Sequence, residues 1–284
     1  MEYRFSNDLK AIREMVGITQ ADLAKELGVQ QVTLSRSELG KTKPSDKLLE
    51  QVYCYAFDNK IKLGKLKEML WLEDLEPGHR LLFHGAKGEI DGPINVKRSR
   101  ANNDFGQGFY TGENYEQAIS FVSGFQQSSV YYLDFDERGL KCKKYKVDQD
   151  WMLTIAYYRG TLEGYREHPL IKKLVKESKD CDYIVAPIAD NRMFRIINSF
   201  IDGEITDEQC KHCLAATNLG DQYVFTTERA VGKLTLLERS YISSSERDYY
   251  MGMRGEDAKL GEDKVKLARI EYRGKGHYID EILK

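Results

Sequence analysis

Apolar residues recur at helical spacing along the first part of the chain. Two runs stand out: Leu9, Ile12, Met15 and Val16, then Leu23, Ala24 and Leu27. Each run predicts a helix with one apolar face turned toward a core. Gly17 and Gly28 separate the runs, so the helices are short.

The signals for helix ends agree with this division. Thr19 is placed as the N-cap of the second helix, with Asp22 three residues later as a weaker form of the capping-box acid. A third helix is expected from about residue 30 to residue 39, before a Gly-Lys-x-Lys-Pro turn. The first sixty residues are therefore predicted to be a small all-α bundle.

The pattern changes after the Pro77-Gly78 turn. Short apolar runs such as "VYYLDF", "DYIVAPI" and "DQYVFTT" alternate with helical segments, which predicts a mixed α/β region with mostly antiparallel strands. We divide the chain into a bundle (1–60), a helical linker (61–78), this second domain (79–240) and a charged extension (241–284). The extension is expected to be helical or partly mobile.

Composition narrows the class of protein. The 284 residues carry a formal net charge of −2, so contact with nucleic acid needs a local basic patch. No segment approaches the ~18 apolar residues of a membrane span, and five scattered cysteines do not suggest a disulfide framework. We expect a cytoplasmic protein. The "CKHC" at Cys210 to Cys213 lacks a second ligand pair for a metal, and a capped helix with buried thiols is the preferred interpretation.

The bundle resembles the helix-turn-helix domain of phage repressors over roughly residues 6 to 58. The matching pattern is Thr19-Gln20-x-x-Leu23-Ala24, Gly28, Ser35-Arg36 and Gly40-Lys41-x-Lys43-Pro44-Ser45. The resemblance implies that the third helix enters the major groove of DNA. The residues assigned to DNA binding are Gln20, Gln30, Gln31, Thr33, Arg36, Lys41 and Lys43. A protein-docking bundle is the alternative, and DNA binding would favour a homodimer.

A glycine-rich stretch, "NNDFGQGFYTGE", invites a dinucleotide-loop interpretation. The residues before Gly106, "NVKRSRANND", cannot form the buried strand that a Rossmann loop requires, and the third glycine, Gly112, comes one residue too late. The stretch must act in another way.

Three motifs, taken in sequence order, indicate how this stretch acts. "LLFHGA" at 81–86, "GQGFYTGE" at 106–113 and "GDQYVFTT" at 220–227 resemble the PARP-like branch of the ADP-ribosyltransferase fold, over about residues 79 to 240. With "DYIVAPIAD" they are most similar to a bacterial domain family of unknown function. The resemblance implies an α+β fold built as a split antiparallel β-sandwich with helices, and NAD as substrate without a metal.

The resemblance also assigns roles within an NAD site. His84 and Gly85 would hold the nicotinamide riboside, Tyr110 would stack on nicotinamide, and Tyr115 is a candidate for the opposite face. Asp104, Gly106 and Gly108 would border the site. Trp151 would line the pocket or pack in the core, with the core preferred.

The third motif departs from the His, Tyr, Glu signature of the PARP-like branch, because Gln222 stands where that signature has the catalytic Glu. A carboxamide still accepts a hydrogen bond from a ribose hydroxyl, but it brings no negative charge. Two outcomes follow: transfer to an acceptor that needs little activation, or a role for another acid such as Glu228, Glu113 or Asp104. Single transfers become more plausible than long polymers. Asp190 and Arg192 would contact the acceptor or the diphosphate, or form a surface ion pair.

The sequence thus predicts an NAD-dependent mono-ADP-ribosyltransferase with a DNA-binding module, acting as a bacterial toxin or phage-defence effector. Its acceptor would be a nucleic acid or a protein, and an antitoxin is a possible partner. One rival is a non-catalytic transcription regulator that senses NAD or ADP-ribose. A weaker rival is an NAD glycohydrolase.

Overall fold

The computed structural model describes residues 1–216 and 219–284, with the backbone alone for 257, 258 and 260. The chain divides into two compact units, each made from segments distant in sequence. Unit 1 comprises residues 1–91, 114–134 and 235–254, and unit 2 comprises 92–113, 135–234 and 255–284. This division cuts the chain differently from the four consecutive segments proposed from sequence.

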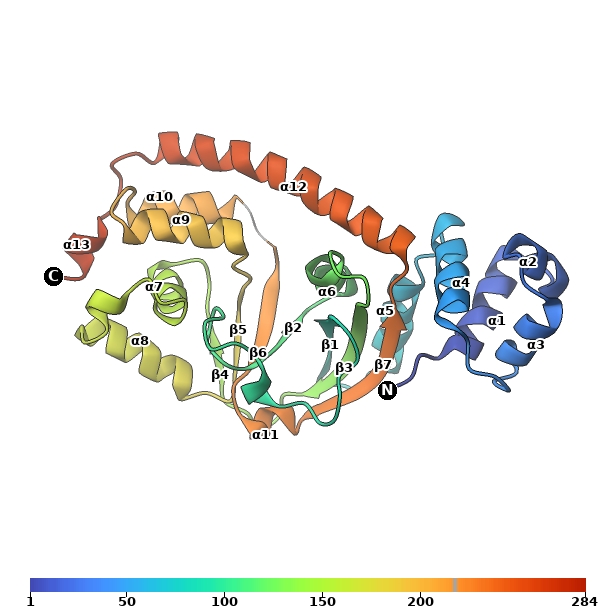
Figure 1. The fold of residues 1–284 in the computed structure, drawn as a ribbon. Helices are drawn as coiled ribbons and strands as arrows, with labels where there is room; N and C mark the ends of the chain where they lie inside the picture. The colour runs from blue at the N-terminus through green and yellow to red at the C-terminus, as the bar shows by residue number, and fades with distance from the viewer. Residues whose placement is uncertain (217–218) are drawn as a thin grey trace. The chain divides into compact units, whose positions relative to one another are not determined.

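Unit 1 begins with the predicted bundle, shown in blue in Figure 1. The helices of the bundle are α1 (Phe5–Val16), α2 (Gln20–Glu26), α3 (Gln31–Glu38) and α4 (Asp46–Asp58). They are followed by α5 (Leu63–Asp74), in the segment proposed as a linker. The rest of unit 1 consists of β1 (His79–Ala86), α6 (Tyr115–Val122), β3 (Ser129–Asp136), β7 (Leu234–Tyr241) and the first part of α12 (Ser244–Glu271). Its strands follow the order β1-β3-β7.

The bundle forms as the apolar periodicity predicts. Leu9, Ile12 and Leu23 are fully buried. Thr19 caps α2 by accepting a hydrogen bond from the Asp22 backbone nitrogen at 3.1 Å. Met15 is an exception, because its side chain is 53% exposed.

A buried ion cluster connects the bundle to the rest of unit 1. Lys67 on α5 donates to Asp8 on α1 at 2.7 Å and lies 2.6 Å from Glu238 on β7. Trp71 also donates to Glu238, at 3.0 Å. Because Lys67 is buried between two carboxylates, the segment proposed as a linker is an integral part of unit 1.

Unit 2 holds the remaining elements. They are η1 (Val96–Arg98), β2 (Phe109–Gly112), β4 (Cys142–Lys144), α7 (Gln149–Tyr158), η2 (Glu163–Tyr165), α8 (Pro169–Lys179), β5 (Tyr183–Pro187), α9 (Asn191–Ile201), α10 (Asp207–Ala215), β6 (Asp221–Phe225), α11 (Glu228–Val231) and α13 (Ile279–Ile282). Its strands follow the order β4-β5-β6-β2. Because β4 and β5 run parallel while β5–β6 and β6–β2 are antiparallel, the pairing is mixed and not wholly antiparallel.

Helices cover the core of unit 2. Trp151, Ile197 and Phe200 are fully buried in it, so Trp151 packs in the core as preferred. Thr206 forms a capping box at the start of α10, and Cys210 and Cys213 are fully buried. The prediction of a capped helix with buried thiols is confirmed. Thr217 and Asn218, at the end of that sequence segment, lie outside the described residues.

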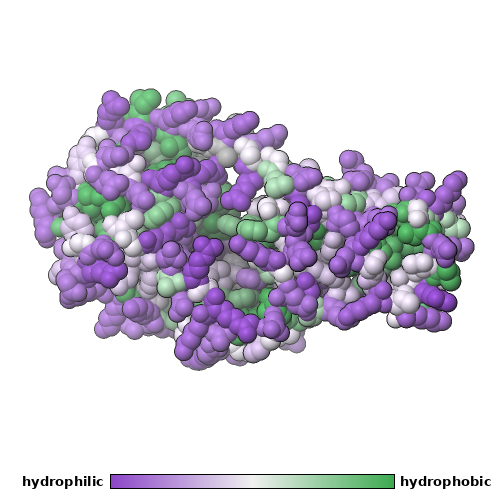
Figure 2. Space-filling view, in the orientation of Figure 1, coloured by the Kyte–Doolittle hydropathy of each residue, from purple (hydrophilic) through white to green (hydrophobic). Residues whose placement is uncertain are grey.

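The charged C-terminal segment is helical in α12 and α13. Hydrophilic side chains predominate on the face of the molecule seen in Figure 2. No helix among the described residues is long and apolar enough to cross a membrane.

Candidate functional site

The third helix of the bundle presents the predicted DNA-reading residues to solvent. Gln30 is the N-cap of α3, and Gln31, Thr33 and Arg36 follow on its exposed surface. Lys41 and Lys43 are exposed in the turn after α3, where Lys43 pairs with Glu2. Amide and guanidinium groups on an exposed helix are suited to base edges, and the lysines to phosphates.

Gln20 differs from the other six because its amide is already engaged. Its Nε2 donates to Glu38 Oε2 at 3.0 Å, and Arg13 Nη2 donates to Glu38 Oε1 at 2.8 Å. The hydrogen bond from Arg13, helped by that from Gln20, lowers the pKa of Glu38. Gln20 therefore fixes α3 relative to α1 and α2.

In unit 2, the second and third motifs lie on neighbouring antiparallel strands. Tyr110 on β2 is opposite Val224 on β6, and Gly112 is opposite Gln222. Opposed residues and residues two apart share one face of a sheet. Tyr110 and Gln222 therefore project from the same face, and the residue opposite Gln222 has no side chain.

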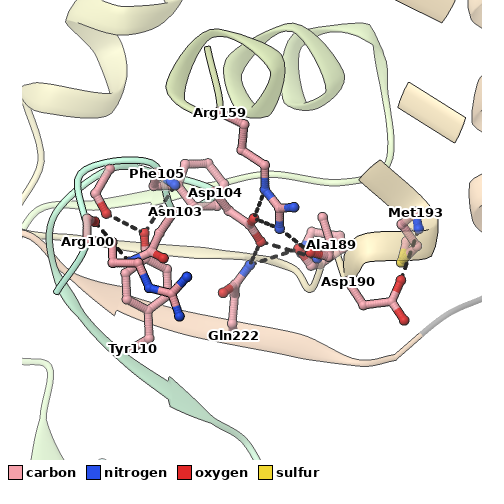
Figure 3. Close-up of polar contacts among 12 residues, drawn as sticks. Arg100, Asn103, Asp104, Phe105, Tyr110, Arg159, Ala189, Asp190, Met193 and Gln222 are labelled. Carbon is pink, nitrogen blue, oxygen red and sulfur yellow. Dashed lines mark hydrogen bonds and ion pairs between the residues drawn. The ribbon is translucent and has the colours of Figure 1, made fainter. Parts of the chain in front are cut away.

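A buried carboxylate organises this face (Figure 3). Arg159, just after α7, donates to Asp104 Oδ1 through Nε at 2.8 Å. Gln222 Nε2 donates to Asp104 Oδ2 at 2.9 Å, and the Ala189 backbone nitrogen donates to the same oxygen at 3.3 Å. Arg159 also donates to the Ala189 carbonyl at 2.6 Å. Asp104 thus connects the glycine-rich stretch that contains it (residues 102–108, called the glycine loop below) to α7, β6 and the segment before α9.

This network decides the orientation of the Gln222 carboxamide. An ionised carboxylate beside an arginine only accepts hydrogen bonds, so the nitrogen of the amide must face Asp104. The Pro187 carbonyl accepts a second bond from Nε2 at 3.3 Å. None of the described residues donates a hydrogen bond to Gln222 Oε1. Figure 3 shows this oxygen on the side where Tyr110 lies.

Tyr110 closes the glycine loop through its hydroxyl. It accepts a hydrogen bond from the Phe105 backbone nitrogen at 3.1 Å and donates to the Gly106 carbonyl at 2.8 Å. Burial raises the pKa of Tyr110 well above its ordinary value. The hydroxyl is therefore a fixed neutral group that holds the loop.

The glycines of the motifs are required by close packing. Gly106 has a φ of +75°, and a Cβ there would meet the Tyr158 ring at 2.9 Å. A Cβ on Gly108 would meet the Phe225 carbonyl at 2.9 Å, and one on Gly85 would meet the Ala118 carbonyl at 2.5 Å. These contacts account for the three glycines within the fold itself.

Four sequence-based assignments need correction. Asp104 already accepts four hydrogen bonds, so it positions other residues instead of contacting a ligand. Tyr115 is 0% exposed and packs against Tyr132, which contradicts its expected stacking role. Asp190 caps α9 and pairs with Arg192 at 3.0 Å, and because Asp190 is buried and Arg192 half-buried, this ion pair is partly buried and not fully exposed.

The fourth correction concerns Glu228. Gln222 is the second residue of β6, whereas Glu228 follows the far end of that strand. The two side chains therefore do not share a site. Glu113, by contrast, is the exposed residue directly after Gly112, which is opposite Gln222.

The remaining assigned residues, His84 and Gly85, belong to β1 of unit 1, where His84 is half-buried. Sequence reasoning missed Arg159 and Ala189. Arg159 stands in "AYYRG" with no motif around it, and Ala189 acts through its backbone alone. No local signal in the sequence identifies either residue.

The bundle defines the class of the N-terminal region. Residues 9–52 match the helix-turn-helix family, so the chain carries a DNA-binding module of this class and that prediction is confirmed. Residues 81–236, more than half of the chain, match the family described as "Protein of unknown function (DUF3990)". The chain belongs to that family, in agreement with the resemblance to a domain of unknown function. No curated protein and no solved structure gives a match.

Proposed function

We propose that the chain is an NAD-dependent mono-ADP-ribosyltransferase that works beside a DNA-binding module. One observation carries the proposal: Gln222 Oε1 is an oriented hydrogen-bond acceptor on the face that also carries Tyr110. A ribose hydroxyl needs such an acceptor, and the residue opposite Gln222 on β2 is a glycine, which has no side chain to bond to this oxygen. The residues present therefore fit the nicotinamide riboside part of NAD. His84 and Gly85 are assigned by resemblance alone.

NAD, as substrate, supplies the ADP-ribosyl group. The bond between C1′ of the ribose and the nicotinamide nitrogen breaks, and its electron pair leaves with nicotinamide. The acceptor then bonds to C1′ through a lone pair and releases its proton to solvent water. Gln222 would hold the ribose hydroxyl while positive charge develops on the sugar.

Asp104 explains how Gln222 could bind the ribose hydroxyl at the position where the His, Tyr, Glu signature has a glutamate. Its carboxylate lies 2.9 Å from the Gln222 nitrogen, so it polarises the amide and increases electron density on Oε1. A glutamate at this position would instead place two carboxylates together. The pairing of Asp104 with Gln222 favours single transfers of ADP-ribose, because neither side chain is free to act as the general base for chain elongation.

Nicotinamide release from NAD tests the assignment. Wild type should release nicotinamide, and Gln222→Ala should reduce the rate by about a hundredfold, since one oriented group is lost at the reacting sugar. His84→Ala tests the first motif, and Tyr157→Phe is a control substitution at a tyrosine whose hydroxyl bonds to no described residue. Equal rates in wild type and Gln222→Ala would remove Gln222 from the site. Release without transfer to any acceptor would identify an NAD glycohydrolase.

A second candidate is a non-catalytic DNA-binding regulator that senses NAD or ADP-ribose. The observation in its favour is that Gln222 is uncharged and 7% exposed, with its nitrogen engaged in the protein. Growth arrest on expression, relieved by Gln222→Ala, supports the toxin or phage-defence role and predicts an antitoxin partner. Unimpaired growth together with NAD-dependent DNA binding, for example by a homodimer, supports the regulator.

A further inference from the structure

A basic groove lies in unit 2, apart from the face that carries Gln222. It is a cavity of about 280 Å³ between α9 and the second half of α12. These helices lie alongside each other in Figure 1. Val265 on α12 accepts a hydrogen bond through its carbonyl from Cys213 on α10, at 3.5 Å. The groove is therefore bounded by elements that contact one another.

Its charge is strongly one-sided. Four basic side chains line it, Arg192, Arg195, Lys266 and Arg269, against one acidic side chain, Glu262. Arg192 is already held by Asp190 at 3.0 Å and is only 22% exposed. Arg269 pairs with Glu204 at 3.2 Å and Lys266 with Asp263 at 3.4 Å, but these side chains are 47% to 81% exposed. Exposed pairs of this kind are weak and exchange readily with another anion.

Arg195 is the most available of the four. It is exposed on α9, and none of the described residues pairs with it. Arg192, Arg195 and Ser199 stand at i, i+3 and i+7, so they form one stripe along α9. A planar guanidinium with open donors is the side chain best suited to bind phosphate.

The floor between the basic side chains is apolar. Ile196, Ile205 and Val265 line it. The flat face of a nucleobase can pack against an apolar floor while the phosphate meets a basic rim. About 280 Å³ is close to the lower end of the range typical of ligand pockets, so the groove suits one nucleotide unit better than the dinucleotide NAD.

The groove begins next to the Asp104 network. Arg192 is in the first turn of α9, two residues after Asp190. Ala189, the residue before Asp190, donates a hydrogen bond to Asp104 through its backbone nitrogen and accepts one from Arg159 through its carbonyl. A strand lying along α9 would therefore lead toward the segment that holds Gln222.

We propose that this groove binds the backbone of single-stranded nucleic acid, and that this strand is the ADP-ribose acceptor. The binding claim stands on the groove itself. The acceptor claim rests on the proposed transferase function. The duplex bound by α3 and the single strand bound here are then separate ligands of one chain.

Fluorescence anisotropy of the full-length protein with labelled mixed-sequence 12-nucleotide RNA and DNA single strands tests the binding. Arg195→Glu/Arg269→Glu should weaken single-strand affinity at least about tenfold and flatten its salt dependence, because phosphate contacts are lost. It should leave duplex binding unchanged. Gln31→Ala/Arg36→Ala should weaken duplex binding and leave single-strand affinity unchanged. Lys176→Glu on α8 is the matched charge-reversal control. The milder Arg195→Ala, at an exposed position, guards against a folding defect.

The outcomes separate the claims. Equal single-strand affinity in wild type and both groove variants overturns the proposal, as does binding of AMP with no binding of single strands. Groove-dependent binding without label transfer from NAD retains the binding site and refutes the transferase. Label transfer to protein that is insensitive to the groove variants refutes the acceptor assignment alone.

Discussion

Asp104 fixes the chemistry of Gln222 at the scale of single residues. Its carboxylate is held by Arg159 and Ala189, and it can only accept a hydrogen bond from the amide nitrogen, so Gln222 Oε1 faces away from Asp104. Asp104 was predicted to border the site, but its partner stands 118 positions later. A sequence motif shows residue types, whereas this hydrogen bond depends on the pairing of β2 with β6.

Exchanging the two groups tests this pairing. Gln222→Glu places two carboxylates together and should cost about 1 to 3 kcal/mol of stability. The shared proton raises the pKa of the pair in the folded state, so this loss should grow as pH rises. Asp104→Asn removes the partner of Arg159 and should also destabilise. The double variant restores a donor facing an acceptor, so its loss should be smaller than the sum of the single losses by about 1 kcal/mol or more.

Chemical unfolding at pH 6 and pH 8 measures this cycle. In a Trp71→Phe background the fluorescence of Trp151, fully buried in unit 2, reports that unit. Losses that add within about 0.5 kcal/mol would show that the two side chains are not coupled.

The hydroxyl of Tyr110 gives a second residue-scale prediction. Tyr110→Phe leaves the Phe105 nitrogen and the Gly106 carbonyl without their partner, and should destabilise unit 2 by about 1 to 3 kcal/mol. Tyr157→Phe is the matched control, because no described residue hydrogen-bonds to its hydroxyl. The same unfolding assay measures both, and equal losses would refute the role of Tyr110 in holding the loop.

At the scale of elements, we expect α3 to be the reading helix. Gln31→Ala and Arg36→Ala should each cost about 1 to 3 kcal/mol in binding to a preferred duplex sequence, because each would remove an expected base-edge contact. Lys47→Ala on α4, also exposed, serves as control. Selection from a random duplex library measures the effect. The same enriched motif in wild type and variants would exclude α3 as the reader.

The start of α12 carries a pH-sensitive contact. Burial raises the pKa of Glu246 from 4.5 to about 7, although Tyr115 donates to it at 3.1 Å and Lys67 and Lys62 act in the opposite direction. A raised carboxyl pKa favours the folded state while the group is protonated. This stability is lost as pH rises from about 4.5 through 7, by about 3 kcal/mol in total.

Glu246→Gln should remove this pH dependence. The difference in stability between wild type and the variant should therefore change between pH 5 and pH 8, with wild type losing more. Thermal unfolding across that range measures it, and parallel curves for the two proteins would contradict the assignment.

At the scale of the whole molecule, sequence and structure agree where interactions are local. The bundle helices, the Thr19 cap and the exposed α3 follow from spacing within sixty residues. The segments that make up each unit do not follow from local spacing. They depend on contacts such as those of Lys67 with Asp8 and Glu238, which are 59 and 171 positions away. Arg159 escaped prediction for the same reason, and the burial of Tyr115 reversed its expected role.

The central claim is transfer of ADP-ribose from NAD, and label transfer tests it most directly. Purified protein is incubated with NAD labelled in the ADP-ribose moiety and with separate pools of protein, duplex DNA, single-stranded DNA and RNA, while free nicotinamide is measured in parallel. The account predicts label on a single-stranded nucleic-acid pool, matched by nicotinamide release and lost in Gln222→Ala. NAD binding with neither label transfer nor nicotinamide release would contradict it and would leave the DNA-binding regulator as the function.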